Sequence, residues 1–278
     1  MKSIYIALLV VFFVSCDSND DISTEYIDYT VENEQEILSY IANNNLDATR
    51  TDSGLYYVID DQGEGSEITA TSDVTVKFKG YFTNGEVFGE NQDTGFTDNL
   101  QNLIEGWKEG LQLFNEGGRG ILIIPAHLAY GSNDYSVIPG GSVVIYDIEV
   151  VDYDAENKQE IIDYIDDNNL DAQSTDSGLY YVIDEQGTGE KPTGTSQVTV
   201  NYKGYYTDGE VFDESTTEVS FYLDSVIEGW TEGLQLFNEG GSGKLLIPSA
   251  LAYGKYGIAG AIPGGAVLIF DVELISVN

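Results

Sequence analysis

Residues 227–237 read IEGWTEGLQLF, and residues 104–114 read IEGWKEGLQLF. In the later stretch, Ile227, Trp230, Leu234 and Phe237 recur at the spacing of one face of a short helix. Two glycines interrupt this helix, and each costs about 1 kcal/mol relative to alanine. A helix that keeps them indicates close packing against a neighbouring element. We therefore expect each stretch to form the floor of a site, with the rest of its copy as the walls.

The two stretches belong to two copies of one long unit. Residues 51–60, TDSGLYYVID, recur unchanged at residues 175–184, and the offset of about 124 residues holds along nearly the whole unit. So long a period predicts tandem domains rather than a solenoid. The chain is divided as follows: a signal peptide at 1–15, a lipidated cysteine and acidic tether at 16–32, a first domain at 33–154 and a second at 155–278. The junction at residues 154–156 is polar and short, so the two domains are expected to sit close together.

Each copy has the pattern of a helix followed by strands. Apolar residues at helical spacing surround Ile37 and Ile161, and asparagine-rich segments follow them as stop signals. The second copy then shows strand patterns at 179–183, 198–202, 243–247 and 266–275, with an Asp-Gly hairpin turn at 208–209. Strand-rich halves with one central helix predict an α+β fold, in which a sheet wraps around a helix.

Composition excludes several classes of function. The 278 residues include 48 acidic and 11 basic ones, so the net charge is −37 and no nucleic-acid partner is expected. Solubility explains this acidity, and adaptation to salt or weak surface binding of calcium are alternatives. The sequence shows no EF-hand, Cys/His metal cluster, Ser/His/Asp set or phosphate loop, so we expect no metal and no cofactor. His127 is the only histidine, and its counterpart is Ala250, so a mechanism shared by both copies cannot need it.

The chain begins with the features of an export signal. Residues 4–14 are an apolar run too short for a stable membrane anchor, and Cys16 is the only cysteine. The stretch resembles a bacterial lipoprotein signal, which implies lipid on Cys16 and a cell-envelope location, at the outer membrane of a Gram-negative bacterium and facing the periplasm or the surface. An ordinary signal peptide that contains a cysteine is the alternative. Residues 17–21 resemble the acidic export signal of surface lipoproteins, or form an unspecific linker.

The second copy carries a series of motifs in a family order. They are VNYKG at 200–204, GEVFD at 209–213, VIEGW at 226–230, LAYG at 251–254, Ile262-Pro263 and LIFDVEL at 268–274. This series resembles the FKBP-type peptidyl-prolyl cis-trans isomerases over nearly the whole copy, and the first copy matches through the repeat. The resemblance implies an antiparallel sheet half-wrapped around the tryptophan helix. It also implies an apolar pocket that binds proline-containing protein segments, and in the second domain a possible macrolide inhibitor.

The resemblance assigns the pocket residues motif by motif. In the second domain they are Tyr202, Phe212, Asp213, Val226, Ile227, Trp230, Tyr253, Ile262 and Phe270. The same positions in the first domain are Phe78, Phe88, Gly89, Leu103, Ile104, Trp107, Tyr130, Ile138 and Tyr146. Spacing alone leaves core packing as the alternative for the aromatic residues, and it favours that alternative for Phe212 and Phe270.

Such a pocket suits the isomerisation of a peptide bond. Partial double-bond character gives that bond a barrier of about 18–20 kcal/mol, and uncatalysed X-Pro rotation takes tens of seconds. An apolar aromatic pocket removes water from the imide, which favours the twisted amide over the planar one. A donor such as the Tyr253 hydroxyl could hold the rotated carbonyl. A ten-thousand-fold acceleration requires about 5.5 kcal/mol.

The first domain departs from the pattern at paired positions. Phe78 lacks the hydroxyl of Tyr202, and Gly89 lacks the carboxylate of Asp213, so both partners of an expected hydrogen bond are missing together. The loop from 131 to 138 is also one residue shorter than its counterpart. We therefore expect an isomerase that assists the folding of exported or surface proteins, with its activity mainly in the second domain. The alternative is a non-catalytic module that binds proline segments, as a chaperone or within an envelope complex.

Overall fold

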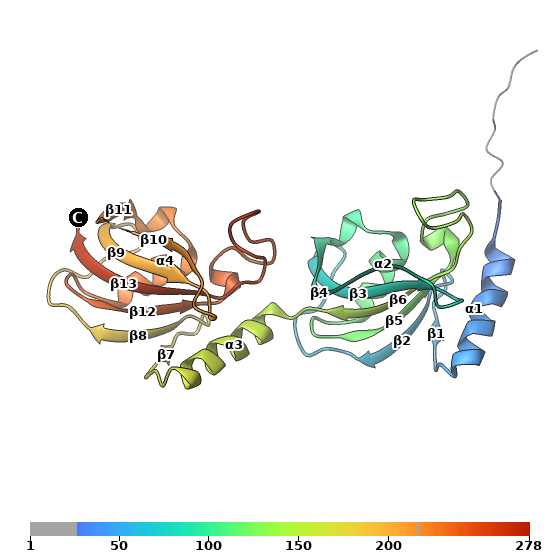
Figure 1. Ribbon diagram of the computed structural model, residues 1–278, viewed down its shortest axis with the longest axis horizontal. Coiled ribbons are helices and arrows are strands. Elements are labelled where there is room, and N and C mark those ends of the chain that lie inside the picture. Colours follow the sequence, from blue (N-terminus) through green and yellow to red (C-terminus); the bar gives the residue numbers. More distant parts are fainter. Residues whose placement is uncertain (1–26, 216) are drawn as a thin grey trace, which may run out of the picture.

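The computed structural model describes residues 27–215 and 217–278, which form two copies of one α+β unit (Figure 1). The export signal, Cys16 and most of the expected tether lie outside the described residues. Domain 1 runs from α1 to β6 and domain 2 from α3 to β13. All strand pairs in the two sheets are antiparallel. The predicted α+β class is therefore confirmed.

Domain 1 has a sheet in the order β1-β2-β5-β6-β3-β4. Its elements are α1 (Thr30–Asn44), β1 (Thr49–Arg50), β2 (Tyr56–Asp61), β3 (Asp73–Phe82), β4 (Val87–Asn99), α2 (Glu105–Gly110), β5 (Arg119–Ile124) and β6 (Val144–Val150). Short 3-10 turns, η1 (Leu100–Asn102), η2 (Leu111–Leu113) and η3 (Ala126–Leu128), flank α2 and follow β5.

Domain 2 repeats this plan with the order β10-β9-β13-β12-β8-β7, and β11 also pairs with β9. Its elements are α3 (Tyr153–Asp167), β7 (Gln173–Ser174), β8 (Tyr180–Glu185), β9 (Gln197–Tyr205), β10 (Val211–Glu214), β11 (Val219–Tyr222), α4 (Glu228–Gly233), β12 (Ser242–Ile247) and β13 (Leu268–Val277). The 3-10 turns are η4 (Leu223–Ser225), η5 (Leu234–Leu236) and η6 (Ser249–Leu251).

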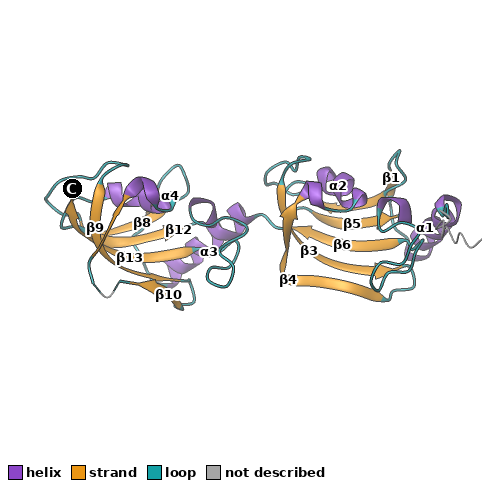
Figure 2. Ribbon diagram, turned by 90° about the horizontal axis from the view of Figure 1, so that it is seen from above, coloured by secondary structure: helices purple, strands orange, loops and turns teal. Residues whose placement is uncertain are grey.

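Each sheet buries both of its faces. Along β12, Leu245 packs into the core that holds Trp230, whereas the next residue, Leu246, packs with Ile161 of α3. This alternation follows from the two-residue period of a strand. Figure 2 shows α4 and α3 against the sheet of domain 2. Each domain is thus a sheet between a short helix, which forms the site floor, and a longer opening helix.

The short helices lie as close to the sheet as their glycines suggest. A Cβ atom at Gly229 would lie 2.4 Å from Cγ2 of Ile247, and one at Gly233 would lie 2.7 Å from Cδ1 of Leu245. Only residues 228–233 are α-helical, and residues 234–236 continue as a 3-10 turn. The expected close approach is confirmed, although the regular helix is shorter than the apolar spacing indicated.

The short polar junction between the domains is part of a helix. Residues 154–156 form the first turn of α3, and the Asp152 side chain caps that helix by accepting a hydrogen bond from the Ala155 amide at 3.0 Å. Acidic residues such as Asp154 and Glu156 favour a first helical turn, because they oppose the positive end of the helix dipole. The chain therefore passes directly from β6 into the opening helix of domain 2.

A buried asparagine attaches each opening helix to its domain. The Asn157 amide donates to the Gly265 carbonyl at 2.8 Å, and its oxygen accepts from the Ser249 amide at 2.7 Å. Asn33 makes the same two bonds in domain 1, to Gly141 and Ala126. Neither asparagine was predicted to be buried, although both lie in a repeated pattern, Tyr-x-x-Glu-Asn, at 29–33 and 153–157. Helix α3 is thereby fixed to the loop between η6 and β13.

Candidate functional site

The floor of the domain 2 site is the Trp230 ring, which α4 places inside the curved sheet. The indole is 5% exposed, and rings from two strands meet it edge-on. Its centroid lies 5.1 Å from that of Tyr202 on β9 and 5.0 Å from that of Phe270 on β13, at interplanar angles of 86° and 85°. Phe212 on β10 contacts Phe270 in the same manner at 5.5 Å. These edge-to-face contacts hold the rings in a fixed arrangement.

Eight of the nine residues predicted for domain 2 surround one cavity of about 450 Å³. A cavity of this size is typical of a small-molecule or short-peptide site. Its lining consists of Tyr202, Phe212, Asp213, Phe221, Ser225, Val226, Ile227, Trp230, Ala252, Tyr253 and Phe270.

The lining differs from the predicted set at four positions. Ile262 is 8% exposed and packs in the core of the domain instead of lining the cavity. Phe221, Ser225 and Ala252 line the cavity but were not predicted. Phe221 lies on β11, and its ring centroid is 5.1 Å from that of Trp230. The only sequence signal for Phe221 was the strand-like alternation of residues 219–222. Alternation alone does not show which face of a strand points to the site.

A hydrogen bond joins the two polar residues at the rim of the cavity. The Tyr202 hydroxyl donates to Oδ2 of Asp213 at 2.7 Å, as the resemblance implied. Burial raises the pKa of Tyr202 to about 12, and the bond to Asp213 contributes to the same shift. The phenol therefore keeps its proton at neutral pH and remains a donor. Asp213 is exposed rather than partly buried, so its carboxylate retains access to solvent.

Tyr253 supplies the free donor of the site. Its side chain lines the cavity and is 39% exposed. Within residues 27–215 and 217–278, its hydroxyl makes no hydrogen bond to the protein. A group that enters the cavity can thus accept a hydrogen bond from it without displacing a protein partner.

Domain 1 has the same ring arrangement over Trp107, with a different polar edge. Phe78 and Tyr146 meet the Trp107 ring edge-on at 5.5 and 5.1 Å. The hydroxyls of Tyr130 and Tyr146 are hydrogen-bonded to each other at 2.9 Å, and burial raises the pKa of Tyr146 far above its ordinary value. Tyr130, the counterpart of Tyr253, therefore has a hydrogen-bond partner within the protein.

The remaining predicted positions of domain 1 lie around this cluster. Phe88 contacts the Tyr146 ring at 5.5 Å, Ile138 is buried in the core, and Leu103 and Ile104 pack against that core. A Cβ atom at Gly89 would meet nothing within 4 Å, so the place that corresponds to the Asp213 side chain is open. Domain 1 thus retains the apolar part of the arrangement and lacks its polar pair.

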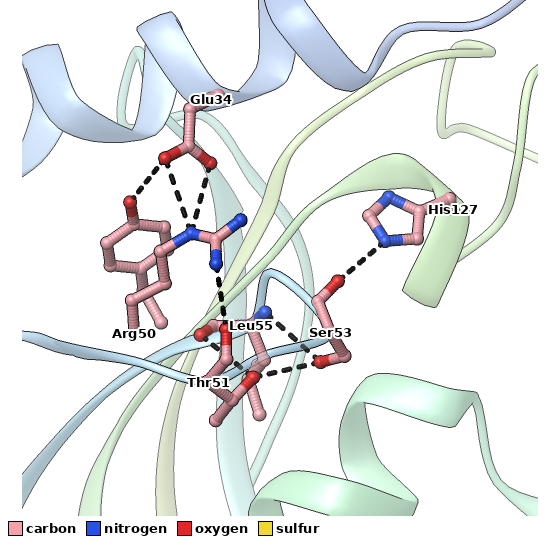
Figure 3. Close-up of polar contacts among 7 residues, drawn as sticks. Glu34, Arg50, Thr51, Ser53, Leu55 and His127 are labelled. Carbon is pink, nitrogen blue, oxygen red and sulfur yellow. Dashed lines mark hydrogen bonds and ion pairs between the residues drawn. The ribbon is translucent and has the colours of Figure 1, made fainter.

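The histidine belongs to a separate polar cluster of domain 1, between α1 and the turn before β2 (Figure 3). Nε2 of His127 lies 3.0 Å from the Ser53 carbonyl oxygen, while Arg50 and Tyr56 both contact the Glu34 carboxylate. In domain 2, Ala250 stands in place of His127, Ser174 in place of Arg50 and Lys158 in place of Glu34, and only Tyr56 keeps its residue type, as Tyr180. The cluster therefore braces η3 and α1 of domain 1 and contributes no group to the aromatic site.

Two other properties bear on the site. The described part of the chain contains no group of three or more His, Cys, Asp or Glu side chains that could hold a metal ion. Between residues 27 and 278, with residue 216 left aside, no helix has the length and apolar character needed to cross a membrane.

Comparison with known proteins identifies the repeated unit. The family model described as FKBP-type peptidyl-prolyl cis-trans isomerase matches residues 64–151 and again residues 188–275. The FKBP-type isomerase FkpA of Aeromonas hydrophila is 50% identical over 109 residues, which cover 38% of this chain and 40% of the relative. FkpA of Escherichia coli K12 is 45% identical over 133 residues, which cover 47% of this chain and 48% of the relative.

The match to these curated relatives therefore spans about half of their length or less. A crystal structure of FkpA from Escherichia coli is 43% identical and covers 45% of this chain and 60% of that chain, with a TM-score of 0.41.

Proposed function

The chain belongs to the FKBP-type peptidyl-prolyl cis-trans isomerase family, and on this premise we propose that it isomerises X-Pro bonds in protein segments, mainly at the domain 2 cavity. The observation that carries the proposal is the aromatic cavity over Trp230 with the unengaged Tyr253 hydroxyl at its edge. The proposed roles of the predicted residues follow from where they lie.

The aromatic rings would act on the proline and its imide. Trp230, Phe212 and Phe270 offer an apolar surface that takes the proline ring and excludes water from the bond to be rotated. Water bound to the carbonyl favours the planar, charge-separated amide, so its removal lowers the barrier to rotation. Val226 and Ile227 complete the apolar wall, and Ile262 supports it from the core. The same cavity is proposed to take a macrolide inhibitor, which would compete with a proline peptide.

The polar residues would position the substrate. Tyr253 donates to the carbonyl oxygen in its rotated position, so this bond is made in the twisted state and not in the planar one. The gain comes from the position of the donor, because the oxygen of a twisted amide carries less negative charge than that of a planar amide. Tyr202 and Asp213 hold each other at 2.7 Å and keep the rim of the cavity in place. Neither a nucleophile nor a proton transfer is needed, because no bond other than the rotating one changes.

The hydroxyl of Tyr253 provides a direct test. We expect Tyr253→Phe to lower kcat/KM of the full chain for a short X-Pro peptide about tenfold, since one transition-state donor is lost. Tyr130→Phe is the matched control, because it removes the same atom from domain 1, and it should leave the rate unchanged. Cis–trans exchange measured by NMR line shapes gives both values. A wild-type chain that is folded and does not accelerate exchange would contradict the proposed activity.

The geometry of domain 1 favours a second function there. Its Tyr130 hydroxyl is engaged with Tyr146, and the Phe78 and Gly89 positions lack the polar pair. We therefore propose that domain 1 binds proline-containing segments and contributes little turnover. The proposed clients of both domains are exported or surface proteins, because the leader sequence has the features of an export signal.

Attachment to the cell envelope is proposed from the leader alone. The apolar run at 4–14 followed by Cys16 supports cleavage before that cysteine and lipidation of its thiol and amine. We expect Cys16→Ser to abolish incorporation of labelled palmitate and to release the protein from the membrane fraction of a bacterial host. Ser15→Ala, which keeps the thiol, is the control. A Cys16→Ser protein that still fractionates with membranes would contradict the lipid anchor.

A further inference from the structure

Domain 1 contacts the loop of domain 2 that follows Tyr253. The Lys255 ammonium donates to the Asp73 carbonyl oxygen at 3.0 Å and forms an ion pair with the Glu116 carboxylate. The Tyr256 hydroxyl donates to Oδ1 of Asp73 at 2.9 Å. The loop that leads into β13, dark red in Figure 1, lies on the side of domain 2 that faces domain 1. We call these contacts of Asp73 and Glu116 with Lys255 and Tyr256 the interdomain clasp.

The ion pair of the clasp is shielded from solvent. The Glu116 side chain is only 12% exposed and that of Lys255 28%. A carboxylate with so little access to water requires a partner, so removal of Lys255 would leave the Glu116 charge uncompensated. Glu116 itself is held in a tight turn, where its amide donates to the Ser66 carbonyl at 2.9 Å. The clasp therefore connects the loop to a rigid part of domain 1.

The loop is fixed at its base as well. The Gly265 amide donates to the Gly254 carbonyl at 2.9 Å and so closes the loop, and Asn157 of α3 binds the Gly265 carbonyl. Tyr253 lies immediately before this closure. It lines the aromatic cavity and also a second cavity of about 570 Å³ between the domains, which Glu116, Lys255 and Tyr256 border. Tyr253 thus adjoins this closed base and lies two residues before Lys255, which domain 1 holds.

The repeat shows that most of the clasp is not a general property of the fold. The positions that correspond to Lys255 and Tyr256 in domain 1 are Ser132 and Asn133, and the one that corresponds to Asp73 in domain 2 is Gln197. Only Glu116 has an equivalent, Glu239, and that carboxylate accepts a hydrogen bond from the Val277 amide within its own domain. The residues differ between the copies at the places where the two domains meet.

We propose that Asp73 and Glu116 of domain 1 are positioning residues of the domain 2 site, which act by holding the Lys255–Tyr256 segment and, through it, the Tyr253 hydroxyl. This inference rests on the proposed function. It gives domain 1 a role in the turnover of domain 2 that does not require domain 1 to bind a substrate.

Glu116→Gln in the full chain tests the clasp with little change in size. Two quantities are measured, namely kcat/KM for a short X-Pro peptide and amide hydrogen exchange of the segment 253–265. Loss of the ion pair should raise exchange in that segment and lower kcat/KM roughly tenfold, because a small misplacement of a catalytic donor has a large kinetic cost. Glu239→Gln is the matched control and should change neither quantity.

A double-variant cycle separates positioning from a general loss of stability. Lys255→Met also removes the hydrogen bond to the Asp73 carbonyl, so it should cost at least as much as Glu116→Gln. The two changes together should cost no more than Lys255→Met alone, because both remove the same ion pair. Fully additive losses would overturn the proposal. So would unchanged exchange in Glu116→Gln, or increased exchange with an unchanged rate. If the wild-type chain itself were inactive, the proposed function would fail, and the exchange data would still decide whether domain 1 holds the loop.

Discussion

Replacing Trp230 with leucine is expected to lower kcat/KM of the full chain about 100-fold, equivalent to about 2.7 kcal/mol of transition-state stabilisation. The indole forms the floor of the cavity and is contacted edge-on by Tyr202 and Phe270. Leucine would leave empty volume under the proline ring, admit water to the imide and release the rings that the indole holds. Each of these changes weakens binding of the twisted amide more than binding of the planar one.

The repeat supplies a control that few single-domain enzymes offer. Trp107 is as buried as Trp230, at 5% exposure, and has the same edge-on contacts. Trp107→Leu should therefore cause a similar loss of stability while leaving kcat/KM nearly unchanged. The rate of cis–trans exchange of an X-Pro peptide, measured well below the first melting transition of each variant, separates a loss of activity from a loss of stability. Equal losses of activity in both variants would contradict an active site mainly in domain 2.

The same pair of variants separates catalysis from binding. If the chain acts chiefly as a binding module, protection of an unfolding client protein from aggregation should persist in Trp230→Leu while isomerisation disappears. If folding assistance depends on turnover, both should fall together. Aggregation is followed by light scattering and refolding by a proline-limited client, since proline isomerisation limits the refolding of many such proteins.

The sequence predicted the fold well because its signals were local and occurred twice. The Asp-Gly turn at 208–209 indicated a hairpin, and Gly209 and its counterpart Gly85 do adopt the positive φ values of 90° and 86° that such turns require. Asparagines were read as helix stops, and Asn45 and Asn169 both take a left-handed conformation with φ of 52° at those ends. Turn and cap chemistry depends on a few neighbouring residues, so it can be read without a structure.

The lining of the site was less predictable because it depends on how distant segments meet. Ile262 and Phe221 lie in segments whose apolar pattern fits either the core or the cavity, and only the curvature of the sheet decides between them. The engagement of Tyr130 by Tyr146 needed both side-chain positions. The interdomain clasp could not be predicted from the sequence for the same reason, since Lys255 and Glu116 are 139 residues apart in the chain.

Substitution of the glycines in α4 is expected to lower the stability of domain 2. Gly229→Val is expected to lower the free energy of unfolding of domain 2 by about 3 kcal/mol, and Gly229→Ala by about 1 kcal/mol. In an exposed helix, replacement of glycine by alanine would stabilise by about 1 kcal/mol. Here the new Cβ would lie 2.4 Å from Cγ2 of Ile247, a fully buried side chain on β12, so the core must rearrange to accept it. The penalty of overpacking therefore exceeds the gain in helix propensity.

Calorimetry of the full chain can test this loss of stability, because the same substitution can be made at the equivalent position of either domain. Gly106 stands in the same relation to Ile124, also at 2.4 Å, so Gly106→Val should shift the transition of domain 1 as Gly229→Val shifts that of domain 2. Gly89→Ala, where a Cβ meets nothing within 4 Å, should change stability by less than about 0.5 kcal/mol. Combining Gly229→Ala with Ile247→Ala should cost less than the sum of the two, because the new methyl group occupies part of the space that the isoleucine leaves. A stabilising Gly229→Ala would contradict the close contact between α4 and β12. The placement of the Trp230 ring in the cavity depends on the same contact.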